Sequence, residues 1–286
     1  MVDNKEKRRQ HDQPISRRRF VQGATGLTTS VLVADFFSTK TWTEGWAQYD
    51  LGQDVYYGSR YGVVEHHCPS DDPSGEKFIF VRLQYPGGDW YTNIVNYYRW
   101  PSDLKFSQVL SNNTSINVEN YQNPQYVSID DEDIFAYPYI FITGHRGIRL
   151  SKTQTNRLRE YIERGGFIHA EDCDIRLNGG RGFMRPSVHR LMEQLFPNKK
   201  LERLDLSHPV YHTLYDHDEY LGGDKVLYPY ATYDEALMID DRIAVYFSST
   251  DYNRAWEGRP CSPGGEEQRR WAFEQGMNIV AYALSR

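Results

Sequence analysis

Two apolar runs joined by one amphipathic segment constrain the fold of this chain more than any other feature. Residues 137–145 (YPYIFITGH) and 167–172 (FIHAED) have strand length and are largely apolar, and residues 151–164 between them have helical spacing. Such runs are typical of strands buried on both faces of a parallel sheet. Ser151 and Gly165 stand where helices commonly begin and end. The unit therefore predicts two parallel strands connected by a helix.

The same alternation continues along the chain. Further strands are predicted at residues 78–85, 125–130 and 242–250, and further helices at 102–113 (with Ser102 as N-cap), 185–197 and 266–285. Strands that alternate with helices indicate an α/β fold with a mostly parallel sheet and helices on both faces. No repeat or linker follows residue 76, so we expect a single α/β domain over residues 77–286, after a polar, irregular segment at 48–76.

Residues 1–47 are expected to direct the chain out of the cytoplasm. The residues spaced as in the twin-arginine export motif are Ser16, Arg17, Arg18, Phe20 and Val21. The mildly apolar segment that follows, residues 23–34, is shorter than the ~20 apolar residues that span a bilayer. We therefore expect the translocation machinery of this route as a partner, a location in the periplasm or cell envelope, and membrane contact only through this segment if it stays uncleaved.

Charge is unevenly distributed along the chain. The formal net charge is −6, but residues 1–47 carry eight Lys/Arg and five Asp/Glu, which leaves 25 basic and 34 acidic residues, a net of −9, in the remainder. Nucleic-acid binding needs a basic face for phosphate contacts, so we expect no nucleic acid among the partners. Aromatic residues make up 14% of the chain, with 22 tyrosines, which suits a glycan or protein partner as well as a tyrosine-rich core.

Polar residues follow two of the predicted strands at the points where those strands end. His145 and Arg146 follow the first apolar run, and residues 171–174 (EDCD) end the second. Ligands of open parallel sheets bind beyond the carboxyl ends of the strands, so these side chains are expected to share one rim with the loop after residue 247. The candidate ligand-binding residues are His145, Arg146, Glu171, Asp172, Cys173, Asp174, His208 and Asp251.

Several chemistries are open to this rim. Asp172, Asp174 and His145 could ligate a metal ion, because they combine hard oxygen donors with an imidazole, or they could act as acid–base groups. Cys173 could be a nucleophile with a histidine as its base. The structural alternatives are that the aspartates cap loop backbone and that Cys173 is a buried, inert thiol. The pattern identifies no cofactor.

Five stretches of the chain resemble a bacterial family of unknown function, the domain-of-unknown-function family numbered 4159. They are FVRLQYPGGDW (80–90), YPYIFITGH (137–145), LSKTQTNRLREYIERGGFIHAEDCD (150–174), LFPNKKLERLDLSHPVYH (195–212) and GMNIVAYAL (276–284). The resemblance covers roughly residues 77–285. It implies a relationship to the class I glutamine amidotransferase-like group and its trehalose-utilisation relatives, which have a flavodoxin-like three-layer α/β sandwich.

The chain departs from the amidotransferase pattern at the residue that would do the chemistry. The nucleophile of that group stands in a G-x-C-x-G elbow, whereas Cys173 is flanked by Glu171-Asp172 and Asp174-Ile175. An elbow needs small neighbours, and adjacent carboxylates raise a thiol pKa and suppress the thiolate. The resemblance therefore does not extend to glutamine hydrolysis by Cys173.

Three functions remain compatible with these observations. The first, which we favour because the cysteine elbow is missing, is a ligand-binding and possibly carbohydrate-binding module, and it predicts that Trp90, Tyr215 and Tyr220 gather on one face. The second is a hydrolase, metal-dependent or not, which predicts that the three metal-ligand candidates converge, with His208 or His212 added by a loop. The third is a structural or assembly role in the envelope through the loop at 207–235.

Overall fold

The computed structural model describes residues 65–66, 77–91, 101–119, 124–173, 183–225, 231–258 and 260–286. The export-signal residues Arg17, Arg18 and Phe20 and the candidate ligand Asp174 lie outside the described residues. Among the helices in these ranges, none combines the length and the apolar character needed to cross a membrane.

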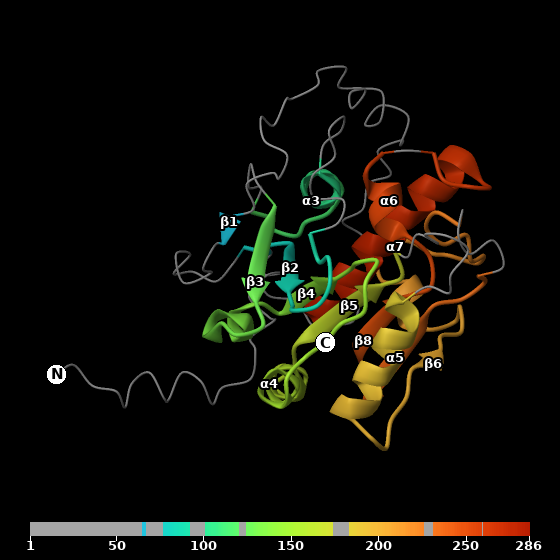
Figure 1. The fold of residues 1–286 in the computed structure, drawn as a ribbon. Coiled ribbons are helices and arrows are strands. Elements are labelled where there is room, and N and C mark those ends of the chain that lie inside the picture. Colours follow the sequence, from blue (N-terminus) through green and yellow to red (C-terminus); the bar gives the residue numbers. More distant parts are fainter. Residues whose placement is uncertain are drawn as a thin grey trace.

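An eight-stranded sheet forms the centre of the molecule (Figure 1). Its strands are β1 (Glu65–His66), β2 (Val81–Gln84), β3 (Gln125–Ser128), β4 (Tyr139–Ile142), β5 (Phe167–Glu171), β6 (Glu202–Arg203), β7 (Glu235–Ile239) and β8 (Arg242–Ser248). They lie in the order β1-β3-β2-β4-β5-β8-β7-β6. The pairings from β1 to β8 are parallel, whereas β7 pairs antiparallel with both β8 and β6. The predicted α/β fold with a mostly parallel sheet is confirmed.

The strand order reverses between β2 and β4. From β2 the chain moves to β3 on one side, and it then returns to β4 on the other side and continues outward through β5 and β8. At such a reversal the loops that leave two neighbouring strands turn in opposite directions, and the crevice between them is where open α/β sheets bind ligands. The loops that leave β2 and β4 carry Asp89 and His145.

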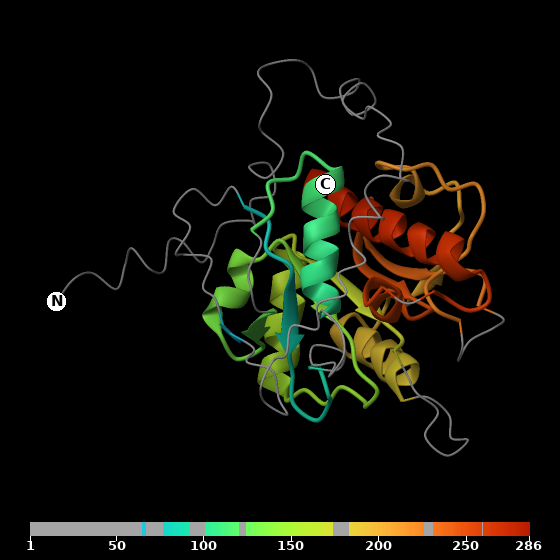
Figure 2. The same cartoon turned by 90° about the horizontal axis from the view of Figure 1, so that it is seen from above.

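Helices cover both faces of the sheet, which gives three layers (Figures 1 and 2). The helices are α3 (Ser102–Asn113), α4 (Lys152–Glu163), α5 (Met184–Leu195), α6 (Tyr252–Trp256) and α7 (Gly265–Ser285). One core joins α3, α6 and α7 to the sheet, and a second core joins α4 and α5 to it. Alternation along β4 serves both cores, because Tyr139 and Phe141 enter the first and Ile140 and Ile142 enter the second.

The helix boundaries follow from local chemistry in one case and from tertiary contacts in another. Ser151 caps α4 as predicted, in a capping box in which its hydroxyl accepts from the Gln154 amide and the Gln154 side chain accepts from the Ser151 amide. The prediction that Ser102 caps α3 is wrong. Pro101 is the N-cap, and Ser102 is the first helical residue, whose buried hydroxyl bonds to Asn253 of α6 instead.

Candidate functional site

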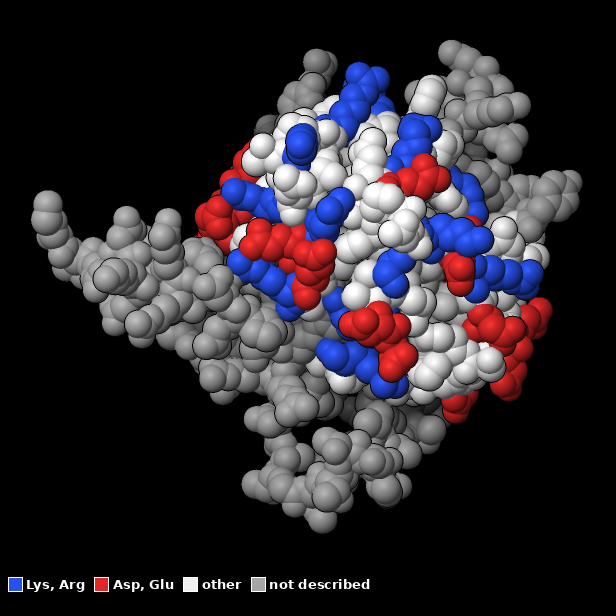
Figure 3. Space-filling view, turned by 90° about the horizontal axis from the view of Figure 1, so that it is seen from below, with Lys and Arg blue, Asp and Glu red and all other residues white. Residues whose placement is uncertain are grey.

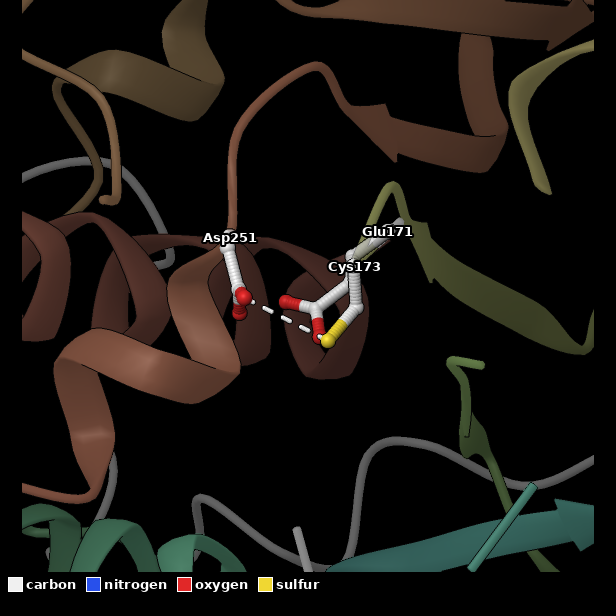
Figure 4. Close-up of side chains that lie close together, drawn as sticks. All are labelled: Glu171, Cys173 and Asp251. Carbon is white, nitrogen blue, oxygen red and sulfur yellow. Dashed lines mark hydrogen bonds between the residues drawn. The ribbon is translucent and has the colours of Figure 1, made fainter. Parts of the chain in front are cut away.

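The candidate site lies at the carboxyl edge of the three central parallel strands. β5 lies between β4 and β8, and Glu171 at the end of β5 is aligned with Ser248 at the end of β8. Cys173 leaves β5, and Asp251 stands between β8 and α6, where it is the N-cap of that helix. The strand order therefore brings Glu171, Cys173 and Asp251 together from distant parts of the sequence (Figure 4).

These three side chains form a buried cluster. The carboxylate oxygens of Glu171 and Asp251 and the Sγ atom of Cys173 all lie within 4.8 Å of one another. The thiol of Cys173 donates a hydrogen bond to Asp251 Oδ2 at 3.3 Å, and Figure 4 shows the Glu171 carboxylate turned toward both partners. The side chains are 0% (Glu171), 1% (Cys173) and 7% (Asp251) exposed, so water contributes little to their solvation.

His145 adds an imidazole to this cluster. Its Nε2 atom lies 3.7 Å from Cys173 Sγ, and its Nδ1 atom lies 2.9 Å from Asp89 Oδ2. The backbone amides of His145 and Arg146 both donate to Asp89 Oδ1, at 2.8 and 2.9 Å. Burial alone would raise the pKa of Asp89, but these hydrogen bonds outweigh it and lower the pKa to about 2. Asp89 is thus an ionised acceptor that orients the ring.

Gly144 makes this close approach possible. A Cβ atom at Gly144 would lie 2.5 Å from the Tyr85 hydroxyl and 3.0 Å from Asp89 Oδ1. The Tyr85 hydroxyl donates to the Thr143 carbonyl at 2.9 Å, so it is held in place. A side chain at this position would therefore push the loop that carries His145 away from the loop that carries Asp89.

The two carboxylates of the cluster are each held by neighbouring donors. Glu171 accepts from the Thr143 hydroxyl at 2.7 Å and from the Asn253 amide at 2.8 Å, and Asp251 Oδ1 accepts from the Arg254 amide at 2.7 Å. Burial, followed by the charge of Asp251, raises the pKa of Glu171 well above its usual value. Burial also raises the pKa of Asp251, to about 6.

The same surroundings keep Cys173 protonated. Burial raises the pKa of its thiol well above the usual value, and the carboxylates of Asp251 and Glu171 raise it further. The guanidinium of Arg82 opposes this only weakly, because it is engaged by Asp103, to which its Nε donates at 2.7 Å. The thiolate that a nucleophilic cysteine requires is therefore disfavoured.

The structure brings together some of the predicted site residues. Glu171, Cys173 and Asp251 form the group with metal-like spacing, and His145 Nε2 lies 3.7 Å from Cys173 Sγ. Asp172 is fully buried in the same turn but is not in that group. Of the predicted metal set, His145 contacts the cluster through Cys173 Sγ, and Asp174 lies outside the described residues. Arg146 contributes its backbone amide to Asp89.

The histidines of the loop at 207–222 are placed elsewhere. His208 packs against Tyr282, which also contacts Phe167 at the amino end of β5, so His208 lies at the opposite edge of the sheet from Cys173. The ring of His212 bonds to the Leu206 carbonyl at 2.7 Å and faces Asp216 at 3.1 Å. The expectation that this loop adds His208 or His212 to the site is therefore wrong.

Asp89 was missed by sequence reasoning. It stands in the sequence GGDW, which follows β2. This sequence is typical of a turn, so it attracts no functional interpretation. Its one sequence clue is that an aspartate follows a predicted strand, as do the carboxylates after β5. The pairing with His145 depends on β2 and β4 being neighbours, which the order of segments along the chain does not reveal.

The predicted aromatic face is not found. Trp90 packs against the core beneath α4 and α5, whereas Tyr215 and Tyr220 pack against the core beneath α7. The Tyr220 hydroxyl donates to the buried carboxylate of Asp234 at 2.8 Å. These aromatic residues therefore stabilise opposite faces of the sheet and form no common platform.

The surface shows no dominant positive field on the side seen in Figure 3. There, Lys and Arg side chains are interspersed with Asp and Glu. A groove of about 690 Å³ lies at the carboxyl end of α5 and is lined by Glu193, Pro197, Asn198, Lys199, Lys200, Glu202 and Met238. This groove contains none of the cluster residues.

The fold and the site define an α/β protein whose mostly parallel sheet carries a buried cluster of one thiol and two carboxylates at its carboxyl edge, with a partly buried imidazole beside the thiol. Residues 79–284, more than half of the chain, match the family model described as "Domain of unknown function (DUF4159)". The chain belongs to this family, as the sequence resemblance predicts. No curated protein sequence matches it.

Proposed function

We propose that this chain is an exported ligand-binding protein of the cell envelope, which holds its ligand at the carboxyl edge of the sheet and does not hydrolyse glutamine. The twin-arginine spacing of Arg17 and Arg18 supports export. The order β3-β2-β4-β5-β8 is second-first-third-fourth-fifth along the chain, which is the order of flavodoxin-like sheets. This order supports the amidotransferase-like class and the placement of the ligand at the reversal between β2 and β4.

The burial and the hydrogen bonding of Cys173 are the observations that favour ligand binding over catalysis by its thiol. Its side chain is 1% exposed, and its thiol donates to the carboxylate of Asp251. A nucleophilic thiol needs the opposite surroundings, with positive charge beside it and small residues in an elbow. The cluster therefore suits recognition of a ligand that is positively charged or rich in hydrogen-bond donors.

One observation favours a second function, hydrolysis. Asp89, His145 and Cys173 form a chain from carboxylate to imidazole to thiol, and this is the arrangement in which a third group orients the base of a nucleophile. The second function requires that the thiol transfers its proton to His145 Nε2 rather than holding it against Asp251. A glycan ligand gains no support from the aromatic residues, which are divided between the two faces.

The reactivity of Cys173 separates these two functions. The purified chain is alkylated with iodoacetamide at neutral pH, natively and in urea, and the modified cysteines are located by peptide mass spectrometry. We expect Cys173 to react at least ten times more slowly in the folded protein than in urea, and no ammonia to be released from glutamine. Fast native alkylation that is lost in His145→Ala would instead support the hydrolase.

Ligand binding at the edge is tested by thermal unfolding. The chain and its Asp251→Asn variant, which is nearly isosteric, are screened against divalent cations, amines and oligosaccharides. A binding protein of the proposed kind is stabilised by at least one of these ligands, and the stabilisation is lost in Asp251→Asn. A ligand that stabilises both proteins equally would bind elsewhere and would contradict the proposed site.

A further inference from the structure

We propose that the ligand at the carboxyl edge is a transition-metal ion of the zinc class, bound by Cys173, Asp251, Glu171 and His145. This inference rests on the proposed function, because it names the ligand of the same site. It replaces the metal set expected from the sequence, since Asp172 is not a member and the sulfur of Cys173 is.

Two of the donor separations are already close to those of a metal centre. Zinc lies ~2.3 Å from sulfur and ~2.0–2.1 Å from nitrogen or oxygen, which places a sulfur about 3.5 Å from the other donors of a tetrahedral site. Cys173 Sγ lies 3.7 Å from His145 Nε2 and 3.3 Å from Asp251 Oδ2. Glu171 completes a group whose atoms are no more than 4.8 Å apart, so its carboxylate would have to approach the sulfur by about 1.3 Å at most.

The four donors come from the carboxyl ends of three neighbouring strands, β4, β5 and β8, and other groups hold three of them in place. A metal-bound histidine normally gives its second ring nitrogen to a carboxylate, and His145 Nδ1 lies 2.9 Å from Asp89 Oδ2. The Thr143 hydroxyl and the Asn253 amide hold Glu171, and the Arg254 amide holds Asp251. This arrangement leaves His145 Nε2 directed at the thiol.

Charge at this edge also favours a cation. Four buried acidic groups lie where the neighbouring strands β5 and β8 end, namely Glu171, Asp172, Cys173 and Asp251. The nearby guanidinium groups are engaged by other carboxylates, Arg82 by Asp103 and Arg254 by Asp224. Glu171 and Asp251 accept hydrogen bonds from the Thr143 hydroxyl and from backbone amides, and a divalent ion would add positive charge beside them.

The donor types select the kind of metal. A thiolate and an imidazole favour zinc, cobalt or copper, whereas magnesium and calcium prefer sites made of oxygen alone. Binding would release the thiol proton, since a thiol that coordinates a metal is deprotonated. The Cys173–Asp251 hydrogen bond would then be replaced by two bonds to the same ion.

The test uses the full chain purified after native export. Elemental analysis is expected to give about one zinc per chain, and Co²⁺ added to the metal-free protein is expected to give a thiolate-to-cobalt charge-transfer band. Cys173→Ser should abolish that band and weaken zinc binding at least tenfold in competition with a chelator. Cys261→Ser, which alters the other described free cysteine, should leave both unchanged.

Asp89→Asn tests Asp89 as a positioning residue. Loss of a carboxylate behind a ligating histidine weakens metal binding by about 10–100-fold, and the charge-transfer band should persist because Cys173 still binds. Circular dichroism of each metal-free variant confirms that it is folded. A wild-type chain that binds neither Zn²⁺ nor Co²⁺, or a Cys173→Ser variant that binds zinc with unchanged affinity, would overturn the inference.

The outcomes also separate this inference from the proposed function. If zinc does not bind but another ligand stabilises the wild-type chain and not Asp251→Asn, the edge is a ligand site and only the metal is wrong. If no ligand of any class depends on Asp251, both proposals fail.

Discussion

Protonation of His217 is expected to weaken the fold in mild acid. The side chain is 5% exposed, its ring lies on Trp271 with centroids 4.7 Å apart, and its Nε2 atom has no hydrogen-bond partner among the described residues. Burial, followed by the nearby His212, lowers the pKa of His217 from its usual 6.5 to about 4. The folded protein therefore excludes a proton that the unfolded chain accepts.

The direction of the effect follows from this difference in pKa. Above pH 6.5 neither state binds the proton, so the full stability is present. As the pH falls below 6.5, the unfolded state is protonated first, and stability decreases until the folded state also binds the proton near pH 4. Between pH 7 and pH 4.5 this single group should lower the free energy of unfolding by roughly 2 kcal/mol.

The assay compares the wild-type chain with His217→Phe. Phenylalanine keeps the ring on Trp271 and cannot bind a proton, and the removed Nε2 atom has no bond to lose. Urea unfolding at pH 7 and pH 4.5, in the presence of a chelator, gives the free energy of each protein. The wild type should lose roughly 2 kcal/mol more than the variant on acidification.

Other buried groups do not obscure the comparison. His169 is fully buried, and burial lowers its pKa to about 3, so it destabilises both proteins in acid by the same mechanism. The difference between the two proteins isolates His217. Equal losses in the wild type and in His217→Phe would refute the reasoning, since the burial of His217 would then have no effect on proton binding.

Three further substitutions test other parts of the fold by urea unfolding. Ser151→Ala removes the capping box of α4 and should cost about 1 kcal/mol, whereas an unchanged stability would mean that water replaces the cap. Trp256→Ala removes a buried ring whose centroid lies 4.3 Å from that of Phe106, and it should lower the free energy of unfolding by about 3–5 kcal/mol. A loss below about 1 kcal/mol would contradict this packing. Gly223→Ala puts a Cβ atom 2.6 Å from the Asp251 carbonyl, so it should cost about 1–3 kcal/mol, and an unchanged stability would contradict this contact.

The strand–helix–strand unit at the centre of the chain could be predicted because its signals are local. The Ser151 cap, the stop at Gly165 and the two apolar runs each act within a few residues. β7 was missed because its signals are not local. Glu235 at its start accepts a hydrogen bond from Arg185 of α5, and Asp234 before it accepts hydrogen bonds from three tyrosine hydroxyls. These polar residues suggest a loop in the sequence, whereas in the fold they are paired with residues of other elements.

Only part of the candidate site could be predicted from the sequence, because some of its contacts also depend on which strands are neighbours. Cys173, Glu171 and His145 could be found from the rule that ligands gather where parallel strands end. Sequence reasoning placed Asp172 in the metal set, whereas the group with metal-like spacing contains Asp251, because side chains that are adjacent in a turn need not point the same way. Which carboxylate meets the sulfur depends on β8 lying beside β5, and this neighbour relation is a property of the sheet.

The end of the sheet at β6 has a consequence for association between copies of the chain. β6 is two residues long, and both of its side chains, Glu202 and Arg203, are exposed and of opposite charge. An unpaired edge invites another chain to add a strand, and short, charged edges resist this. Beyond the antiparallel strand β7, the sheet thus ends on a segment too short to template aggregation.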